Sequence, residues 1–500
     1  MLRLLAVMVV VLGPVASFSA ERVFGTEQAG AVFAAAFTFM APRTLDPVPI
    51  PTLAIWGLRG LTAIDPTLTP ELRAGTLQLA SPDRILFVIP PPAPDDVFGW
   101  GSAAAAMCEA AWTYSAALRE AGTQGIITSF FDELFNHLDP YSRYVAPTAA
   151  ISDENQRNGE AGIGVTLAPR APYPVIARVL AQSPGAAAGL RPGDAVLSVD
   201  GRSARGVAAA RVAQWLGGPD DSLVSVRVLS GRVVRLARLA RATMPPETVF
   251  AARSGNLLVI RITAFAADTA SRVQDELLRG VAAGGLRGVV LDLRGNRGGL
   301  LQQAVGAADQ FMAHGLIATT AGRDPQSVHI FRADAEGGRD LVPGLPVLVV
   351  VDGRTASAAE ILAAALADDR RGVVVGSATL GKGLVQTVTT LPDGGELFVT
   401  WSRVLAPRGW PLQGLGVIPQ VCTSIGEAAI DRQLASLAAG QDMMAGVLDR
   451  SRAARAPLGP GQIIDLRQSC PAAEGRRIDM RVAETLAADP VSYAAALMPP

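Results

Sequence analysis

A serine and a lysine, 25 residues apart, stand out in this sequence as groups that could act together on a bond. Ser357 follows the apolar run LPVLVVV and precedes EILAAALADD, so it lies where a helix is expected to begin. Backbone N–H groups at a helix N-terminus lack helical partners and can stabilise an oxyanion, which suits a nucleophilic serine. The alternative is structural, because S-A-A-E is a capping box in which Ser357 caps the helix and Glu360 reaches back.

Lys382 is the only lysine in a chain with 44 lysine and arginine residues. A lysine can act as a general base when burial favours its neutral form, whereas arginine stays charged. Lys382 lies in GSATLGKGLVQTV, between two apolar runs that predict strands. Gln386, four residues later, is expected on the same side of a strand, where its amide could position the amine. The sequence therefore predicts Lys382 as the base for Ser357.

Histidine is the alternative base. The chain has three histidines, and none of them lies in a recognisable triad motif. They are His137, His314 and His329. Histidine therefore stays a second choice behind Lys382.

Two glycine-rich segments could bring backbone N–H groups close to a ligand. In GVVLDLRGNRGGLLQQAV an apolar strand runs into Gly295, Gly298 and Gly299, although an ordinary tight turn explains this pattern equally well. The segment from Gly376 to Lys382 reads G-x-x-x-x-G-K, as in a phosphate-binding loop. It lacks the following Ser or Thr and precedes a strand where a helix is needed, which argues against nucleotide binding.

The elements that must position these residues follow one another along the chain. Short strands with Gly and Pro turns occupy about 160–241, and strands then alternate with helices, which indicates a buried α/β sheet. The segments before and after are predicted to be helical. With 49% hydrophobic and 18% charged residues and a net charge of −1, the chain is expected to fold as several domains. The charge argues against nucleic acid as a partner, and the cysteines and histidines do not have zinc-site spacing.

The first twenty residues, MLRLLAVMVVVLGPVASFSA, predict a secretory signal peptide cleaved near Ser17 or Ser19. The alternative is an uncleaved membrane anchor. Export permits disulfides, and Cys422 and Cys470 are plausible partners. Cys108 lies among alanines and is expected to be a buried thiol.

Together these motifs resemble the carboxyl-terminal processing (tail-specific) serine protease family over about residues 125–425. TASAAE is similar to the family's nucleophile motif, and LGKGLVQ is similar to its general-base motif. The resemblance implies that Ser357 is the nucleophile, Lys382 the base and Gln386 the family's glutamine. Asp368 matches an aspartate sometimes included in the family's relay.

The same resemblance implies how the transition state and the substrate are held. LDLRGNRGG is similar to the family's glycine turn, so Gly298 and Gly299, together with the amide of Ala358, are implied oxyanion donors. The β-rich segment resembles the family's inserted PDZ domain, with GIGVTL as its carboxylate-binding loop. The residues implied to bind peptide are Gly162, Ile163, Gly164 and Val165, with Arg191 of LRPGD as a lower-ranked link to the active site.

The resemblance implies a multidomain fold with a ClpP/crotonase-like α/β protease core, a β-rich PDZ domain and helical N- and C-terminal regions. The expected segments are a signal peptide (1–20), a helical region (21–147), the PDZ domain (155–242), the protease core (243–425) and a second helical region (426–500).

The expected function is that of an exported serine endopeptidase, periplasmic or otherwise exported, that recognises the C-terminal tails of protein or peptide substrates. Neither a metal nor a cofactor is implied, and an adaptor protein is a further candidate partner. The protein would be membrane-anchored if the signal segment is not cleaved. One alternative is a catalytically weak PDZ-containing scaffold that binds peptides. Another is an acyl-CoA hydratase-like enzyme, which the signal peptide and the PDZ domain disfavour.

Overall fold

The computed structural model describes residues 23–180, 183–333 and 340–498. The chain forms two compact units: Met1–Pro147 with Gln386–Thr400, and Thr148–Val385 with Trp401–Pro500. Each unit has a hydrophobic core of its own. The predicted signal peptide lies outside the described residues. Within them, no helix combines the length and the apolar character that a membrane span requires.

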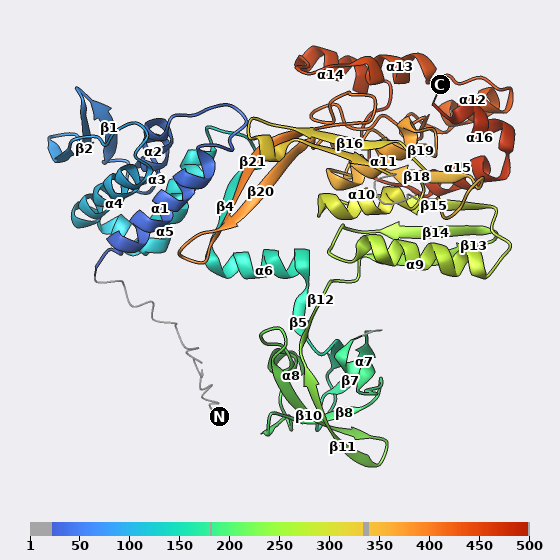
Figure 1. The fold of residues 1–500 in the computed structure, drawn as a ribbon, viewed down its shortest axis with the longest axis horizontal. Coiled ribbons are helices and arrows are strands. Elements are labelled where there is room, and N and C mark those ends of the chain that lie inside the picture. The colour runs from blue at the N-terminus through green and yellow to red at the C-terminus, as the bar shows by residue number, and fades with distance from the viewer. Residues whose placement is uncertain (1–22, 181–182, 334–339, 499–500) are drawn as a thin grey trace, which may run out of the picture. The chain divides into compact units, whose positions relative to one another are not determined.

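The first unit consists mainly of helices, but it also contains a small antiparallel sheet in a region expected to be helical (Figure 1). The helices are α1 Thr26–Met40, α2 Ile50–Leu58, α3 Gly60–Ile64, α4 Val97–Tyr114 and α5 Ala116–Phe135. The sheet has the order β1-β2-β3, with the strands Thr69–Arg73, Thr76–Ala80 and Ile85–Ile89. Ala74 and Gly75 join β1 to β2 with φ angles of 51° and 76°, the geometry of a two-residue hairpin turn. The alternation that buries Leu77 and Leu79 therefore belongs to a strand.

In the second unit, a β-rich module covers residues 160–244 and follows helix α6 (Pro147–Asn158). Its main sheet has the order β11-β10-β8-β7-β6, and two short helices pack beside it. The strands are β6 Val165–Ala168, β7 Val175–Val179, β8 Ala195–Val199, β9 Arg202–Ser203, β10 Leu223–Ser230 and β11 Val233–Ala240; the helices are α7 Pro184–Ala187 and α8 Ala209–Leu216. The entry strand β5 (Glu160–Gly162) pairs with the exit strand β12 (Ala242–Met244), so the module begins and ends at one place.

A six-stranded sheet of order β13-β14-β15-β18-β19-β22 forms the centre of the second unit. All its pairings are parallel except that of β13 with β14. The strands are β13 Val249–Ser254, β14 Leu257–Ile262, β15 Gly288–Asp292, β18 Val347–Val351, β19 Val373–Gly376 and β22 Val421–Cys422. On one face the sheet packs against α9 (Thr269–Ala282), α10 (Leu301–Asp309) and α11 (Ala358–Asp368).

The C-terminal helices cover the other face of this sheet. Alternate residues of β18 turn to opposite sides: Val347, Val349 and Val351 face α11, whereas Leu348 and Val350 belong to the cluster with α12, α15 and α16. The helices after the core are α12 Glu427–Ala438, α13 Ala445–Ala453, α14 Pro460–Arg467, α15 Arg477–Ala488 and α16 Pro490–Ala496. Burial on both faces explains why the strands read as continuous apolar runs.

A second, antiparallel sheet has the order β17-β16-β21-β20, and β4 (Arg143–Val145) also pairs with β21. Its strands are β16 Leu316–Ala321, β17 His329–Arg332, β20 Leu384–Thr390 and β21 Glu396–Leu405, and the short 3₁₀ helix η1 (Pro325–Ser327) precedes β17. The chain passes between the two units within β20 and β21. Cys422 and Cys470, the plausible disulfide partners, are bonded. Cys108 is a buried free thiol, as expected.

Candidate active site

Ser357 lies in a tight turn between β18 and α11, at the N-cap position of the helix. Its φ and ψ angles are 57° and −121°, a backbone conformation that costs a residue with a side chain on the order of 1–3 kcal/mol. Two bonds fix the turn from outside: the Thr355 hydroxyl donates to Leu293 O at 2.9 Å, and Ala356 N donates to Asn296 O at 2.9 Å. The surrounding structure therefore holds a strained serine where a helix begins.

The predicted glycine turn lies directly against Ser357. A Cβ atom added to Gly298, whose φ is 97°, would lie 2.8 Å from Ser357 Cβ and 3.0 Å from Ala358 N. A Cβ atom on Gly299 would lie 2.2 Å from Phe265 O. Both positions require glycine because other backbone passes so close, and the structure brings the turn and the serine together.

The three predicted oxyanion donors differ in how they are used. Ala358 N–H begins α11, where the geometry of a helix supplies no acceptor. Gly298 N–H already donates to Asn296 Oδ1 at 2.8 Å, so it is occupied. Gly299 forms a parallel bridge with Phe265 through the bonds of its neighbours, which leaves its own N–H directed away from that strand. Of the three candidate oxyanion donors, Ala358 N–H and Gly299 N–H are therefore the two that the geometry favours.

A fully buried carboxylate connects the serine turn with the lysine segment. Glu360 Oε2 accepts from Ser357 N at 2.7 Å and from Lys382 N at 2.9 Å. Glu360 Oε1 accepts from Gly381 N at 2.7 Å and from the Thr379 hydroxyl. Burial raises the pKa of Glu360, and the four donated hydrogen bonds act in the opposite direction by stabilising the charged form.

From the sequence, Glu360 is expected to form only the capping-box bond to Ser357. Its bonds to Gly381 and Lys382 were missed, because they join segments more than twenty residues apart in the sequence. The available signal was a lone acidic residue inside the apolar run AAEILAAALA. Such a residue must find several hydrogen-bond donors if it is buried.

Lys382 lies in an irregular segment just before β20 begins, and the residue is half-buried. The strand argument that placed it on one side with Gln386 therefore does not apply. The glycines beside Lys382 are needed because the backbone of 412–414 passes close: a Cβ on Gly381 would lie 2.9 Å from Gly414 C, and one on Gly383 would lie 2.2 Å from Gln413 N. These contacts explain the pattern G-K-G without a bound phosphate.

Gln386 belongs to the first unit, and the structure shows what else its side chain contacts. Its Nε2 donates to Thr400 Oγ1 at 3.0 Å, and Thr400 Oγ1 donates to Asp139 Oδ1 at 2.6 Å. The expected link from Gln386 to Lys382 stays a prediction.

The structure does not bring Asp368 to Ser357. Asp368 is the last residue of α11, and eleven residues at a rise of 1.5 Å separate the two by about 16 Å. The Asp368 carboxylate accepts from Arg452 Nε at 3.0 Å and from Trp410 Nε1 at 2.7 Å, all within the core. Its position and its partners indicate a structural role rather than a relay.

The histidines lie in three different parts of the fold. His137 stacks on Trp56 in the first unit, with ring centroids 4.7 Å apart. His314 lies near Asp369, which follows α11 at the end opposite Ser357. Burial raises the pKa of Asp369, and the charge of His314 acts in the opposite direction. His329 lies exposed on β17, beside Phe331.

The predicted peptide-binding residues line a pocket of about 700 Å³ in the β-rich module. Gly162, Ile163, Gly164 and Val165 form one wall, and α8 and α6 contribute the others. Strand β6 is the end strand of its sheet, and α8 packs beside it. An extended peptide could therefore add to this sheet as a further strand.

The two glycines of this loop are not equally constrained by the fold. Gly164 has a φ of 74°, and a Cβ atom there would lie 2.2 Å from Ser183 Cβ. A Cβ atom on Gly162 would find its nearest neighbours at 3.8 Å, an ordinary contact distance. Arg191 does not line this pocket. It is exposed, and its backbone N–H donates to Asp194 Oδ2 at 3.0 Å.

Comparison with known proteins identifies both parts. Residues 256–423 match the model of peptidase family S41, and residues 175–230 match that of the PDZ domain. The carboxy-terminal-processing protease of Bartonella bacilliformis is 30% identical over 304 residues, which are 60% of this chain and 69% of that protein. A probable CtpA-like serine protease of Staphylococcus aureus is 30% identical over 286 residues, which are 57% of each chain. The solved photosystem II D1 C-terminal processing protease matches 74% of this chain and 92% of its own, with 25% identity and a TM-score of 0.37.

Proposed function

Because the chain belongs to peptidase family S41, the carboxy-terminal-processing proteases, and carries a PDZ domain, we propose that it hydrolyses peptide bonds with a dyad of Ser357 and Lys382. The observation that carries this proposal is the shared carboxylate of Glu360. It accepts from Ser357 N at 2.7 Å and from Lys382 N at 2.9 Å, so one buried group fixes both residues.

In the proposed mechanism, the neutral amine of Lys382 takes the proton of the Ser357 hydroxyl as its oxygen attacks the peptide carbonyl. The tetrahedral intermediate then breaks its C–N bond, and the Lys382 ammonium returns the proton to the leaving amine. Water hydrolyses the resulting ester in the same way, with Lys382 again accepting and returning a proton. Of the protein's own groups, only Ser357 and Lys382 exchange bonds or protons in these steps.

The oxyanion is held by backbone donors in this proposal. Ala358 N–H is supported because it is the first amide of α11, where the partial positive charge of the helix end adds to the hydrogen bond. Gly299 N–H is supported by its direction away from Phe265. Gly298 supports the site by packing, since a side chain there would meet Ser357.

The PDZ domain gives this peptidase a way to select substrates by their C-terminal tails. We propose that a tail adds to β6 in the pocket beside α8, with the amides of Gly162–Val165 around its carboxylate. The side chains that the pocket presents include Ile163, Val165, Leu216 and Met244, so an apolar last residue is expected.

The proposed location is outside the cytoplasm, most simply the periplasm. The apolar N-terminal run supports export, and so does the Cys422–Cys470 disulfide, because disulfides persist in oxidising compartments. N-terminal sequencing of the mature protein tests this, since a chain that still starts at Met1 would instead favour a membrane anchor.

The dyad's nucleophile is tested by Ser357→Ala. We expect this variant to fold with a change of only about 1 kcal/mol, the value of a lost cap, and to lose peptide cleavage by several orders of magnitude. Cleavage of a peptide with a free apolar C-terminus and urea unfolding measure the two effects. If the variant is less stable but cleaves at the normal rate per folded molecule, Ser357 is a cap and not the nucleophile. If the wild-type protein binds the peptide and never cleaves it, the chain is a peptide-binding scaffold.

A further inference from the structure

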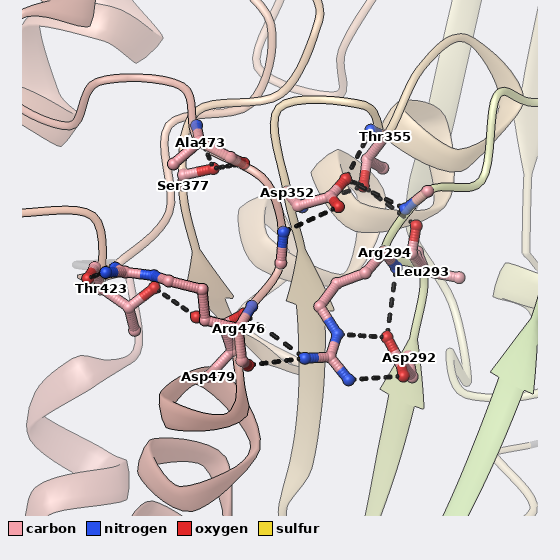
Figure 2. Close-up of polar contacts among 12 residues, drawn as sticks. Asp292, Leu293, Arg294, Asp352, Thr355, Ser377, Thr423, Ala473, Arg476 and Asp479 are labelled. Carbon is pink, nitrogen blue, oxygen red and sulfur yellow. Dashed lines mark hydrogen bonds and ion pairs between the residues drawn. The ribbon is translucent and has the colours of Figure 1, made fainter.

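A short segment near the C-terminus, residues 473–479, contacts the base of both loops that carry the proposed dyad (Figure 2). We name it the C-terminal brace. Ala473 O accepts from Gly353 N at 2.7 Å, at the start of the turn that leads to Ser357. It also accepts from the Ser377 hydroxyl at 2.9 Å, and Ala473 N donates back to Ser377 Oγ at 3.1 Å. Ser377 begins the segment that leads to Lys382. Ala473 of the brace is therefore hydrogen-bonded to the start of both the Ser357 loop and the Lys382 loop.

Asp352 extends the same connection to the glycine turn. Its buried Oδ1 accepts from Gly295 N, Arg354 N and Thr355 N, each at 3.0 Å. Its Oδ2 accepts from Gly475 N of the brace at 3.1 Å. The Asp352 carboxylate therefore links the glycine turn, the turn that leads to Ser357, and the brace.

Arg294 holds the brace from the side of the glycine turn. It donates from Nε and Nη2 to the two carboxylate oxygens of Asp292 at 2.8 Å each, and from Nη1 to Arg476 O at 2.7 Å. A Cβ atom on Gly475 would lie 2.5 Å from Arg294 Cδ, so the brace lies directly against this side chain. Figure 2 shows Arg294 between Asp292 and the turn of Arg476 and Asp479.

The brace is anchored at both of its ends. The Cys422–Cys470 disulfide ties the chain just before it to β22. Asp479, in the first turn of α15, accepts from the Thr423 hydroxyl at 2.6 Å, also next to β22. One anchor, Cys422, belongs to the central sheet and the other, Thr423, follows it directly; strands β18 and β19 of the same sheet lead into the two dyad loops.

We propose that the C-terminal brace, held by the Cys422–Cys470 disulfide, positions the loops of Ser357 and Lys382 for the reaction. This inference rests on the proposed function. The brace fixes the loops at their base, while Glu360 fixes them next to the reacting groups. Its residues are positioning residues, because they act through hydrogen bonds to the loops. Small errors in such positions reduce the rate of the chemical step much more than substrate binding.

Ser377→Ala tests the brace, because it removes both side-chain bonds to Ala473 and leaves the dyad and the PDZ pocket unchanged. We expect kcat for a tail-bearing peptide to fall by about tenfold or more, with KM unchanged, and the rate of acylation by an active-site serine probe to fall in parallel. The matched control is Ser451→Ala, which removes a buried hydroxyl with two hydrogen bonds in α13. The control is expected to lose stability but to keep kcat.

Reduction of the wild-type disulfide gives a second measurement without a substitution. We expect kcat to fall on reduction and to recover on reoxidation, again with KM unchanged. The proposal is wrong if folded Ser377→Ala keeps the wild-type kcat, if its only change is in KM, or if it loses no more kcat than Ser451→Ala. A reduced, folded protein with full kcat also contradicts it. These outcomes differ from failure of the proposed function, in which wild-type cleavage is absent or survives Ser357→Ala.

Discussion

The buried carboxylate of Glu360 holds a serine and a lysine from different loops together, because it accepts hydrogen bonds from the backbone of both. Four donors point at its two oxygens: Ser357 N, Lys382 N, Gly381 N and the Thr379 hydroxyl. A carboxylate can accept all four, since it has two oxygens and no proton to donate. Any group with fewer acceptors must leave part of this arrangement unbonded.

Glu360→Gln tests this reasoning with almost no change in volume. The amide has one oxygen and an NH₂ group, so two of the four donors would face another donor. Each buried donor left without an acceptor costs about 1–3 kcal/mol. We expect a lower free energy of unfolding and a fall in kcat of about a hundredfold, measured by urea unfolding and peptide cleavage. Glu427→Gln, at an exposed helix start, is the control and should change neither.

A fully active Glu360→Gln variant would show that the dyad loops hold their positions without the carboxylate. The shared Glu360 carboxylate would then no longer support the proposed dyad.

For single residues, the sequence could predict local features but not contacts between distant segments, and the dyad itself stays a prediction. A single lysine and a serine at a helix start could be recognised from their neighbours alone. Asp368 matches a motif position, but such a match does not show that it lies at the end of α11 away from Ser357. Glu360 was recognised for its local bond and missed for its distant ones, since bonds between loops depend on the order of strands in the sheet.

Among the helices and strands, the alternation of apolar strands and helices predicted the buried α/β sheet and its helices α9, α10 and α11. The small sheet in the first unit was missed because its strands are short and include polar residues and a proline. The hairpin signal was present, in Ala74 and Gly75, but the surrounding helical pattern outweighed it. Close backbone approach at Gly298 and Gly383 could not be read from the sequence, because each approach involves a distant segment.

The PDZ element gives a prediction about substrate tails. Wild-type protein is expected to cleave a peptide with a free apolar C-terminus faster than the same peptide amidated. Gly164→Ala should unfold or loosen the module because a Cβ atom there meets Ser183. Gly162→Ala fits the fold, so it should keep stability and reduce the preference for the free carboxylate only through contact with the peptide.

Cleavage rates for the two peptides, with thermal unfolding of each variant, measure these effects. Equal rates for free and amidated peptides in folded wild-type protein would contradict recognition of the tail by this pocket.

At the scale of the whole molecule, the C-terminal residues complete the fold of the second unit. Helices α12, α15 and α16 bury the face of the central sheet opposite α11, and the brace just before α15 bonds to Asp352 at the end of β18. The sequence predicted these helices but gave them no role, because the strands they cover are apolar on both faces and do not show which segment packs on which side. The disulfide could be proposed from cysteine count and export, and its function could be inferred only once its neighbours were known.

The central claim is that Lys382 activates Ser357, and the rate at which an active-site serine probe acylates the protein tests it most directly. This rate is to be measured across pH for the wild type, Lys382→Arg and Lys382→Ala, with peptide mapping of the label. We expect a label on Ser357, a wild-type rate that rises with pH through one ionisation, and two variants that are almost equally slow, because guanidinium keeps the charge but cannot accept the proton. A Lys382→Arg protein labelled at the wild-type rate, a label on another residue, or a pH step that moves when a histidine is replaced would contradict it.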